Sequence, residues 1–309
     1  MADTKYMQTV AKKWEESQLA PRTIQTYMTS LKTLAEGPFK SASFIKDPVD
    51  IMTRINKYDS LNTRRTMLSA VIALGRINKT YGKIVKAYLP SNDELRVAIN
   101  KEREERAGAK TEREETNWMS WNDVITKRDE LINDVKRLPE RAFTHPADWT
   151  KATRMMVLSL YTMLPPRRNK DYSEMVMVYT DAEMPKDKNY IVFDKDGTPT
   201  KFIFNVYKTA GKYGSQTIMI PEDLAAIIRI YYEHRKNIVG DRFLLNSDMN
   251  PLHPVNGLTR ILNAALGGNV GSSMLRHIFL SDSGDIGKMT ETAKAMAHSV
   301  GMQTQYMRK

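Results

Sequence analysis

The sequence predicts a mainly helical protein with a small antiparallel β-sheet, an α+β fold in two domains. Apolar residues recur at helical spacing through most of the 309 residues, and strand-like alternation is confined to 188–220. A charged segment, 101–117, separates two parts that are both long enough for a core. We therefore expect a helical domain at 1–108, a charged linker at 109–117 and a second domain at 118–309.

Helical periodicity accounts for the whole N-terminal domain. The first predicted helix, 4–18, carries Met7, Val10 and Trp14 on one face, and Pro21 follows its end. Further helices with the same spacing of apolar residues are predicted at 24–34, 48–57, 60–80 and 92–106. No stretch of this part alternates as a strand does, so we expect helices only.

The C-terminal domain combines helices with a short strand-rich part. Helices are predicted at 121–135, 147–163, 222–237 and 254–266, with two more around Arg276 and before His298. Strands are predicted at 190–193, 201–207 and 216–220, joined by turns at 194–197 and 208–211. These three strands would pair as an antiparallel sheet.

Composition excludes several classes of chemistry. The chain has no cysteine, which excludes disulfides, thiolate catalysis and cysteine-based zinc sites. The five histidines lack the spacing of metal ligands, and no phosphate-binding glycine loop is present. We therefore expect no cofactor and no metal. No apolar run is long enough for a membrane span, and the start lacks a signal pattern, so we expect an intracellular protein.

The charge balance favours a polyanionic partner. The formal net charge is +11, with a pI near 9.5, and the smaller N-terminal domain is the more basic one. A basic balance of this kind is typical of many nucleic-acid-binding proteins.

Three residues near the end of the sequence form a set that suits a phosphodiester: Arg276, His298 and Tyr306. A phenol is a nucleophile, a guanidinium clamps non-bridging oxygens, and an imidazole places or relays a proton. Leu275 and Ile278 would face a core, which turns Arg276 toward the flank of the apolar stripe.

The order and spacing of these residues resemble the C-terminal motif of the tyrosine recombinase, or integrase, family. That motif runs His-x-x-Arg, then Gly-His-Ser, then a tyrosine. The sequence is similar to it at Arg276-His277, at His298 and at Tyr306. It departs from the motif where Ser273 replaces the first histidine.

Two further departures concern the second half of the motif. Ala297 stands in place of the glycine, and Tyr306 follows His298 more closely than in the family.

The resemblance extends to two earlier positions. The family's first catalytic arginine lies three residues before a buttressing acidic residue, and Arg168 and Asp171 share that spacing. Arg167 is the alternative, since a shift of one residue is compatible with the sequence. Lys208, before a strand that ends in Ile-Pro, is similar to the lysine of the family's β-hairpin.

The resemblance implies a two-domain DNA clamp, with a helical core-binding domain and a catalytic domain, encoded by a virus or mobile element. Such a site-specific recombinase or integrase cleaves and rejoins DNA through a 3′-phosphotyrosine. Tyr306 would be the nucleophile, Arg168 and Arg276 would stabilise charge on phosphorus, and Lys208 would protonate the leaving 5′ oxygen. His298 would support the phosphate or the phenol proton.

Four supporting residues complete the implied site. Ser273 would partly take over the hydrogen bond of the missing histidine, and the others are Asp171, Arg167 and His277.

The resemblance also implies the partner and the assembly. We expect double-stranded DNA with specific recombination sites, a monomer without DNA and a tetramer on paired sites. Only three residues follow Tyr306 in the sequence, so contacts between subunits are expected from other surfaces. Two alternatives are a type IB topoisomerase that relaxes DNA, which shares this chemistry, and a non-catalytic DNA-binding relative.

Overall fold

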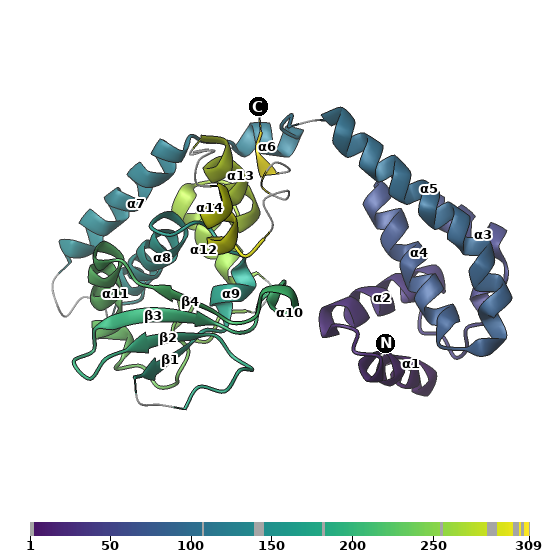
Figure 1. Ribbon diagram of the computed structural model, residues 1–309, viewed down its shortest axis with the longest axis horizontal. Helices are drawn as coiled ribbons and strands as arrows, with labels where there is room; N and C mark the ends of the chain where they lie inside the picture. Colours follow the sequence, from purple (N-terminus) through teal and green to yellow (C-terminus); the bar gives the residue numbers. More distant parts are fainter. Residues whose placement is uncertain are drawn as a thin grey trace. The chain divides into compact units, whose positions relative to one another are not determined.

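A computed structural model describes residues 3–106, 108–138, 145–180, 183–253, 256–282, 289–298, 303 and 306–308. The chain divides into two compact units, Met1–Ala107 and Gly108–Lys309 (Figure 1). Each unit has a hydrophobic core of its own. The described part is mostly helical with one small sheet, which confirms the predicted fold class in its main features.

The N-terminal unit consists of helices α1 (Lys5–Glu16), α2 (Pro21–Leu34), α3 (Pro48–Asn56), α4 (Leu61–Arg76) and α5 (Gly82–Arg106). Short 3-10 turns lie at Ser43–Lys46 and Lys79–Tyr81. The side chains of Thr4, Asp47 and Ser60 cap α1, α3 and α4 by accepting hydrogen bonds from backbone N–H groups of the first turn. The described residues of this unit contain no strand, as predicted.

Helix α5 is longer than the sequence predicts. It begins at Gly82 instead of residue 92 and contains Pro90. A proline inside a helix removes one backbone hydrogen bond and crowds the preceding turn. Packing offsets this loss, because Val85 and Tyr88 are buried in the core and Tyr88 Oη donates to the carbonyl of Ile45 over 2.7 Å.

The C-terminal unit begins with α6 (Glu112–Asn117), which lies within the predicted linker, 109–117. Its other helices are α7 (Trp121–Lys136), α8 (Pro146–Thr162), α9 (Asn169–Ser173), α10 (Ala210–Tyr213), α11 (Glu222–Arg235), α12 (Gly257–Leu266), α13 (Ser272–Asp282) and α14 (Met289–Ala295). Helix α8 is buried on nearly all sides and packs against α7, α11 and α12. It is therefore the centre of this unit's core.

Four strands form one sheet in the order β1 (Val176–Tyr179), β2 (Tyr190–Phe193), β3 (Pro199–Phe204) and β4 (Gln216–Met219). The pairs β2–β3 and β3–β4 are antiparallel as predicted, but β1 pairs with β2 in parallel. The sheet is thus mixed, and the prediction of a purely antiparallel sheet is wrong. Strand β1 was not predicted, and the direction of pairing depends on the path of the chain rather than on local pattern.

The sheet is covered by α11, where the ring of Tyr232 stacks on Phe193 with centroids 4.3 Å apart. None of the helices in the described ranges is long and apolar enough to cross a membrane.

Candidate active site

The segment between α8 and α9 carries the two neighbouring arginines. Pro165 and Pro166 lie between α8 and α9, and Arg168 has an extended backbone at the N-terminal cap of α9. Arg167 is fully buried, whereas Arg168 is partly exposed.

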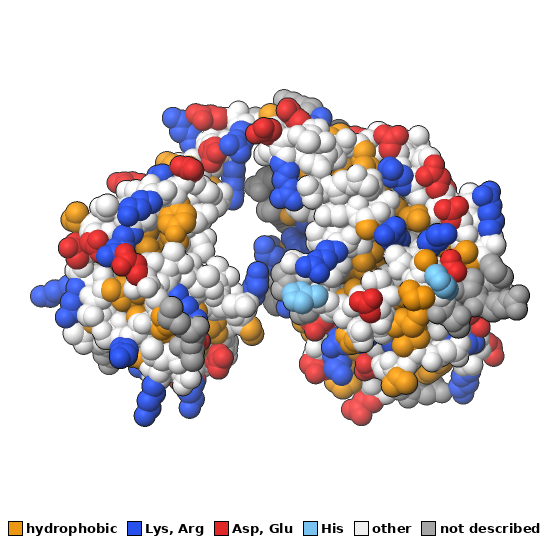
Figure 2. All heavy atoms as spheres, turned by 180° about the vertical axis from the view of Figure 1, so that it is seen from behind, with side chains coloured by type: hydrophobic (Ala, Val, Ile, Leu, Met, Phe, Trp, Pro, Cys, Tyr) orange, Lys and Arg blue, Asp and Glu red, His pale blue; other side chains and the backbone are white. Residues whose placement is uncertain are grey.

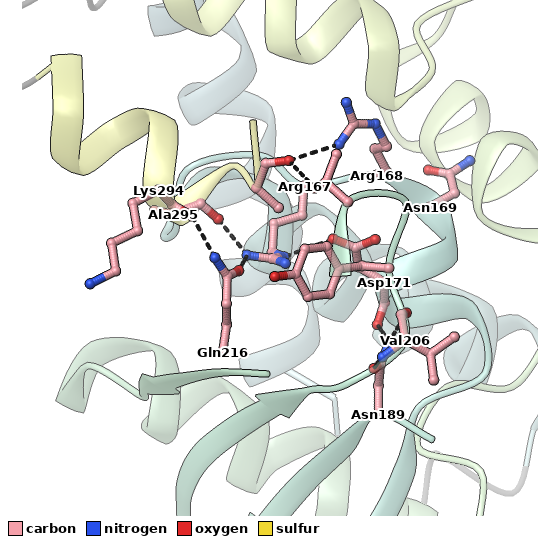
Figure 3. A network of polar contacts seen from close by, with 12 residues as sticks. Arg167, Arg168, Asn169, Asp171, Asn189, Val206, Gln216, Lys294 and Ala295 are labelled. Atoms are coloured by element: carbon pink, nitrogen blue, oxygen red, sulfur yellow. Dashed lines mark hydrogen bonds and ion pairs between the residues drawn. The ribbon is translucent and has the colours of Figure 1, made fainter. Parts of the chain in front are cut away.

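Arg167 joins three elements in the interior (Figure 3). Its Nε donates to Asp171 Oδ2 over 2.8 Å, and its Nη1 donates to Gln216 Oε1 over 3.0 Å and to the carbonyl of Ala295. The guanidinium lies 4.0 Å from the centre of the Phe204 ring. Asp171 therefore pairs with the arginine four residues before it, whereas the sequence spacing had matched it to Arg168.

Asp171 sits where three arginine charges meet. Burial raises the pKa of its carboxyl, and the nearby charges of Arg167, Arg168 and Arg276 oppose that rise. The charges of Arg168 and Arg276, the two candidate phosphate-binding arginines, therefore both act on the Asp171 carboxyl.

The end of α14 fixes the position of His298. The N–H of Ala297 donates to the carbonyl of Lys294 over 3.1 Å, and the N–H of His298 donates to the carbonyl of Ala293 over 3.0 Å. These two bonds form a Schellman motif, in which one residue takes a left-handed conformation. Ala297 is that residue, with φ of 57°. A glycine would adopt this conformation without strain.

The carbonyl of Ala297 is a junction between three distant segments. It accepts hydrogen bonds from Arg168 Nη1 over 3.2 Å and from Thr209 Oγ1 over 2.8 Å. Lys208 precedes Thr209 in the same turn and is exposed. The candidate lysine, the candidate arginine and the candidate histidine therefore lie on segments that meet at one atom.

Lys208 lies in a turn, as predicted, but β3 stops at Phe204 and not at residue 207. The side chain of Asn189 ends the strand: its Oδ1 accepts from the N–H groups of Asn205 and Val206 over 2.8 and 2.7 Å. Its Nδ2 donates to the carbonyls of Asp171 and Val206, each over 2.9 Å (Figure 3). Asn189 thus ties the turn that carries Lys208 to the segment that carries Asp171.

Arg276 and Tyr306 are in direct contact. The guanidinium of Arg276, on α13, lies 4.2 Å from the centre of the Tyr306 ring, and the arginine side chain is 3% exposed. Burial lowers the pKa of Arg276; the Tyr306 hydroxyl opposes this shift, and the charge of Arg168 adds to it. Nε and Nη2 of Arg276 have no hydrogen-bond partner among the described residues. Buried guanidinium donors of this kind fit an anion.

Two imidazoles flank the same phenol. The ring of His277 lies 5.0 Å from that of Tyr306, and the ring of His298 lies 5.5 Å from it, measured between centroids. His298 is buried and also lines a groove of about 920 Å³ beside β4 and α14. Of the predicted site residues, Arg276, His277, His298 and Tyr306 are therefore clustered.

Ser273, the candidate replacement for a histidine, lies on α13 one turn before His277. Both line a cavity of about 440 Å³, together with Glu114 and Arg308. Glu114 pairs with Nδ1 of His277 and accepts from Nε of Arg308.

Sequence reasoning did not identify the parts played by Asn189, Gln216, Glu114 and Arg308. The only local signal concerned Glu114: a threonine three residues before a glutamate marks a capping box, and Thr111 and Glu114 form one at the start of α6. A capping box predicts the beginning of a helix but says nothing of contacts with residues 277 and 308.

No family model matches the sequence, and no curated protein matches it. Among solved structures, the chain is similar to the crystal structure of XerA recombinase, with a TM-score of 0.41 and 13% identical residues. The similarity covers 99% of this chain and 94% of that chain.

Proposed function

We propose that this protein is a tyrosine-type DNA strand transferase, a site-specific recombinase or integrase. One observation carries the proposal: the guanidinium of Arg276 is buried against the ring of Tyr306 and keeps two nitrogen atoms without a partner among the described residues. A cation with spare donors beside a nucleophilic phenol suits a phosphodiester, whose phosphorus the phenol attacks while the cation holds a non-bridging oxygen.

The proposed cleavage step is a transesterification. The Oη of Tyr306 forms a bond to phosphorus, the bond from phosphorus to the 5′ oxygen breaks, and a 3′-phosphotyrosine remains. Lys208 gives a proton to the leaving 5′ oxygen, while His298 holds the phosphate or receives the phenol proton. Arg168 and Arg276 stabilise the charge that develops on the phosphoryl oxygens. Attack by a 5′ hydroxyl reverses the step and rejoins the strand.

Features of the N-terminal unit support a DNA partner. A groove of about 470 Å³ between α2 and α4 is lined by Met67 and by eight polar side chains, namely Arg22, Gln25, Thr26, Thr29, Ser30, Asn62, Thr63 and Thr66. Such donors and acceptors suit phosphates and base edges. The formal net charge is +11, and Figure 2 shows Lys and Arg side chains scattered among Asp and Glu on the visible surface of both units. The proposed partner is duplex DNA with specific sites, and the proposed assembly is a tetramer on paired sites.

Covalent trapping tests the proposal. A pool of nicked duplexes lets the short fragment that carries the free 5′ hydroxyl diffuse away after cleavage, so a phosphotyrosine accumulates on the protein. We expect the wild type to give protein–DNA adducts and Tyr306→Phe to give none while still binding DNA. Tyr58→Phe, a tyrosine change in the N-terminal unit, is the control and should give adducts. Absence of adducts with the wild type, or adducts with Tyr306→Phe, would contradict the proposal.

The trapped DNA distinguishes the recombinase from a relaxing enzyme. Sequencing of the adducts should return a common site. Relaxation of supercoiled plasmids regardless of their sequence, with no common site in the adducts, would instead assign a type IB topoisomerase.

A further inference from the structure

Glu114 differs from the other acidic residues of its helix. Helix α6 carries three glutamates, and only Glu114 is buried, at 6% exposed, whereas Glu112 and Glu115 are exposed. Burial of a carboxylate is costly unless several donors surround it. The hydrogen-bond donors around Glu114 therefore show which segments its buried carboxylate connects.

The two oxygens of Glu114 have separate partners. Oε2 accepts from the N–H of Thr111 over 2.8 Å and from Thr111 Oγ1 over 3.0 Å, which completes the capping box. Oε1 pairs with Nδ1 of His277, and Nε of Arg308 lies 3.1 Å from Oε1 and 3.2 Å from Oε2. Burial by itself would raise the pKa of Glu114, but these hydrogen bonds outweigh it and lower the pKa to about 2.

The contacts of Oε1 exceed what a helix cap needs. A capping box uses the glutamate only to accept from the N-cap backbone, which Oε2 does here. His277 and Arg308 come from 163 and 194 residues further along the chain. The carboxylate therefore connects α6 to α13 and to the end of the chain.

Both of these partners border the proposed nucleophile. The ring of His277 lies 5.0 Å from that of Tyr306, and Arg308 is two residues beyond Tyr306. The N–H of Arg308 also donates to Ser281 Oγ on α13 over 2.7 Å. The Glu114 carboxylate thus contacts both Arg308, just after Tyr306 in the chain, and His277, whose ring packs against the Tyr306 ring.

We propose that Glu114 is a positioning residue that keeps Tyr306 in the active site of its own chain. The effect of Glu114 on DNA cleavage rests on the proposed function. Its effect on the position of residues 306–308 does not. The charge of Glu114 attracts Arg308, and its Oε1 orients His277 through Nδ1, so that the phenol stays against Arg276. Without the carboxylate charge, the segment after Tyr306 detaches and the phenol is misplaced.

The test compares Glu114→Gln with Glu115→Gln. Both remove one negative charge from the same helix, and glutamine at 114 can still accept from Thr111, so α6 keeps its cap. Hydrogen–deuterium exchange of the peptide that contains Tyr306 and Arg308 should rise in Glu114→Gln and stay at the wild-type level in Glu115→Gln. Unchanged exchange of this peptide in Glu114→Gln would overturn the proposal.

A second variant tests the contact between Glu114 and Arg308 without changing the capping box of α6. Arg308→Gln removes the partner at the chain end and leaves Thr111 and Glu114 untouched, so it should free the same peptide. If this peptide exchanges no faster in Arg308→Gln, with exchange in α6 also unchanged, the proposed contact has no role.

Single-turnover cleavage on the trapped site gives the functional readout. We expect Glu114→Gln to lower the cleavage rate by roughly tenfold or more, because misplacement of a reacting group is costly, with DNA affinity unchanged. An equal loss of affinity and rate would indicate a merely structural role and overturn the positioning role. If the wild type forms no adduct, the proposed function fails, while the exchange experiment still decides the role of Glu114.

Mixed subunits test whether the phenol acts in its own chain. Tyr306→Phe supplies an intact set of arginines without a nucleophile, and Arg276→Ala supplies a nucleophile beside an impaired pocket. A mixture of the two should form no more adduct than either alone. Strong adduct formation by the mixture would show delivery to a neighbour and overturn the proposal.

Discussion

Arg167 and Arg168 are neighbours in the sequence, yet their guanidinium groups have different surroundings. Arg167 is buried against Asp171 and Phe204, whereas Arg168 is partly exposed and donates to the carbonyl of Ala297. The sequence favoured Arg168 as the catalytic arginine and kept Arg167 as the alternative. The contacts of Arg167 hold three elements together, although its Nη2 has no hydrogen-bond partner among the described residues. Arg168 remains the proposed phosphate ligand, and Arg167 remains the alternative.

We predict that the two arginines affect different properties. Arg167→Ala leaves Asp171 as an unpaired buried charge and should lower the free energy of unfolding by about 3–5 kcal/mol. Arg168→Ala should change it by less than about 1 kcal/mol but lower the cleavage rate by about 10²–10³-fold. Urea unfolding and single-turnover cleavage measure the two effects. Equal stability of the two variants would contradict this assignment.

Ala297 adopts a backbone conformation that costs free energy for any residue with a Cβ. Its φ is 57°, and the left-handed region costs such residues roughly 1–2 kcal/mol. We predict that Ala297→Gly raises the free energy of unfolding by about 1 kcal/mol and keeps cleavage, because the Schellman motif that positions His298 is retained.

The matched control for this prediction is Ala293→Gly, inside α14. Glycine within a helix should lower the free energy of unfolding by roughly 0.5–1 kcal/mol. Urea unfolding of both variants measures the difference, and a loss of stability in both would argue against strain at Ala297.

Among the elements, α4 and α5 approach each other more closely than ordinary side chains allow. A Cβ on Gly75 of α4 would lie 2.4 Å from Cγ2 of Val85 on α5. Helix α5, which contains Pro90, is therefore held by packing as well as by its own hydrogen bonds.

We predict that Gly75→Ala lowers the free energy of unfolding by about 1–3 kcal/mol through overpacking, although alanine is the better helix former. The double variant Gly75→Ala with Val85→Ala should regain part of the loss, because the colliding methyl group is gone. Thermal unfolding measures both, and a stabilised single variant would contradict the close packing.

Strands were predicted less completely than helices, for a reason visible in β1 and β3. Strand β1 pairs in parallel with β2, and no local pattern encodes the direction of a pairing. Strand β3 ends early because the side chain of Asn189 takes over the backbone groups of residues 205 and 206. Both features depend on residues distant in the sequence.

For the molecule as a whole, charge is the property that bears on the proposed partner. The chain carries 47 Lys and Arg against 36 Asp and Glu, an excess that suits a polyanion. Phosphate contacts release counterions, so their contribution to binding falls as salt is added.

We predict that affinity for duplex DNA falls by roughly 10³-fold or more between about 50 and about 200 mM salt. Tyr306→Phe should show the same dependence, because the substitution removes no Lys or Arg side chain. Fluorescence anisotropy with labelled duplexes measures the affinity. An affinity independent of salt would contradict an electrostatic mode of binding.

Helical periodicity, the confinement of strands to one region and the residue types at 168, 208, 276, 298 and 306 are all apparent in the amino-acid sequence, because each is a local property. The partner of Asp171, the pairing of β1 and the contacts of Glu114 depend instead on the folded chain. Each joins residues whose separation along the chain is unrelated to their distance in space. The physical reason is that burial and hydrogen bonding act between surfaces, and surfaces exist only once the elements have packed.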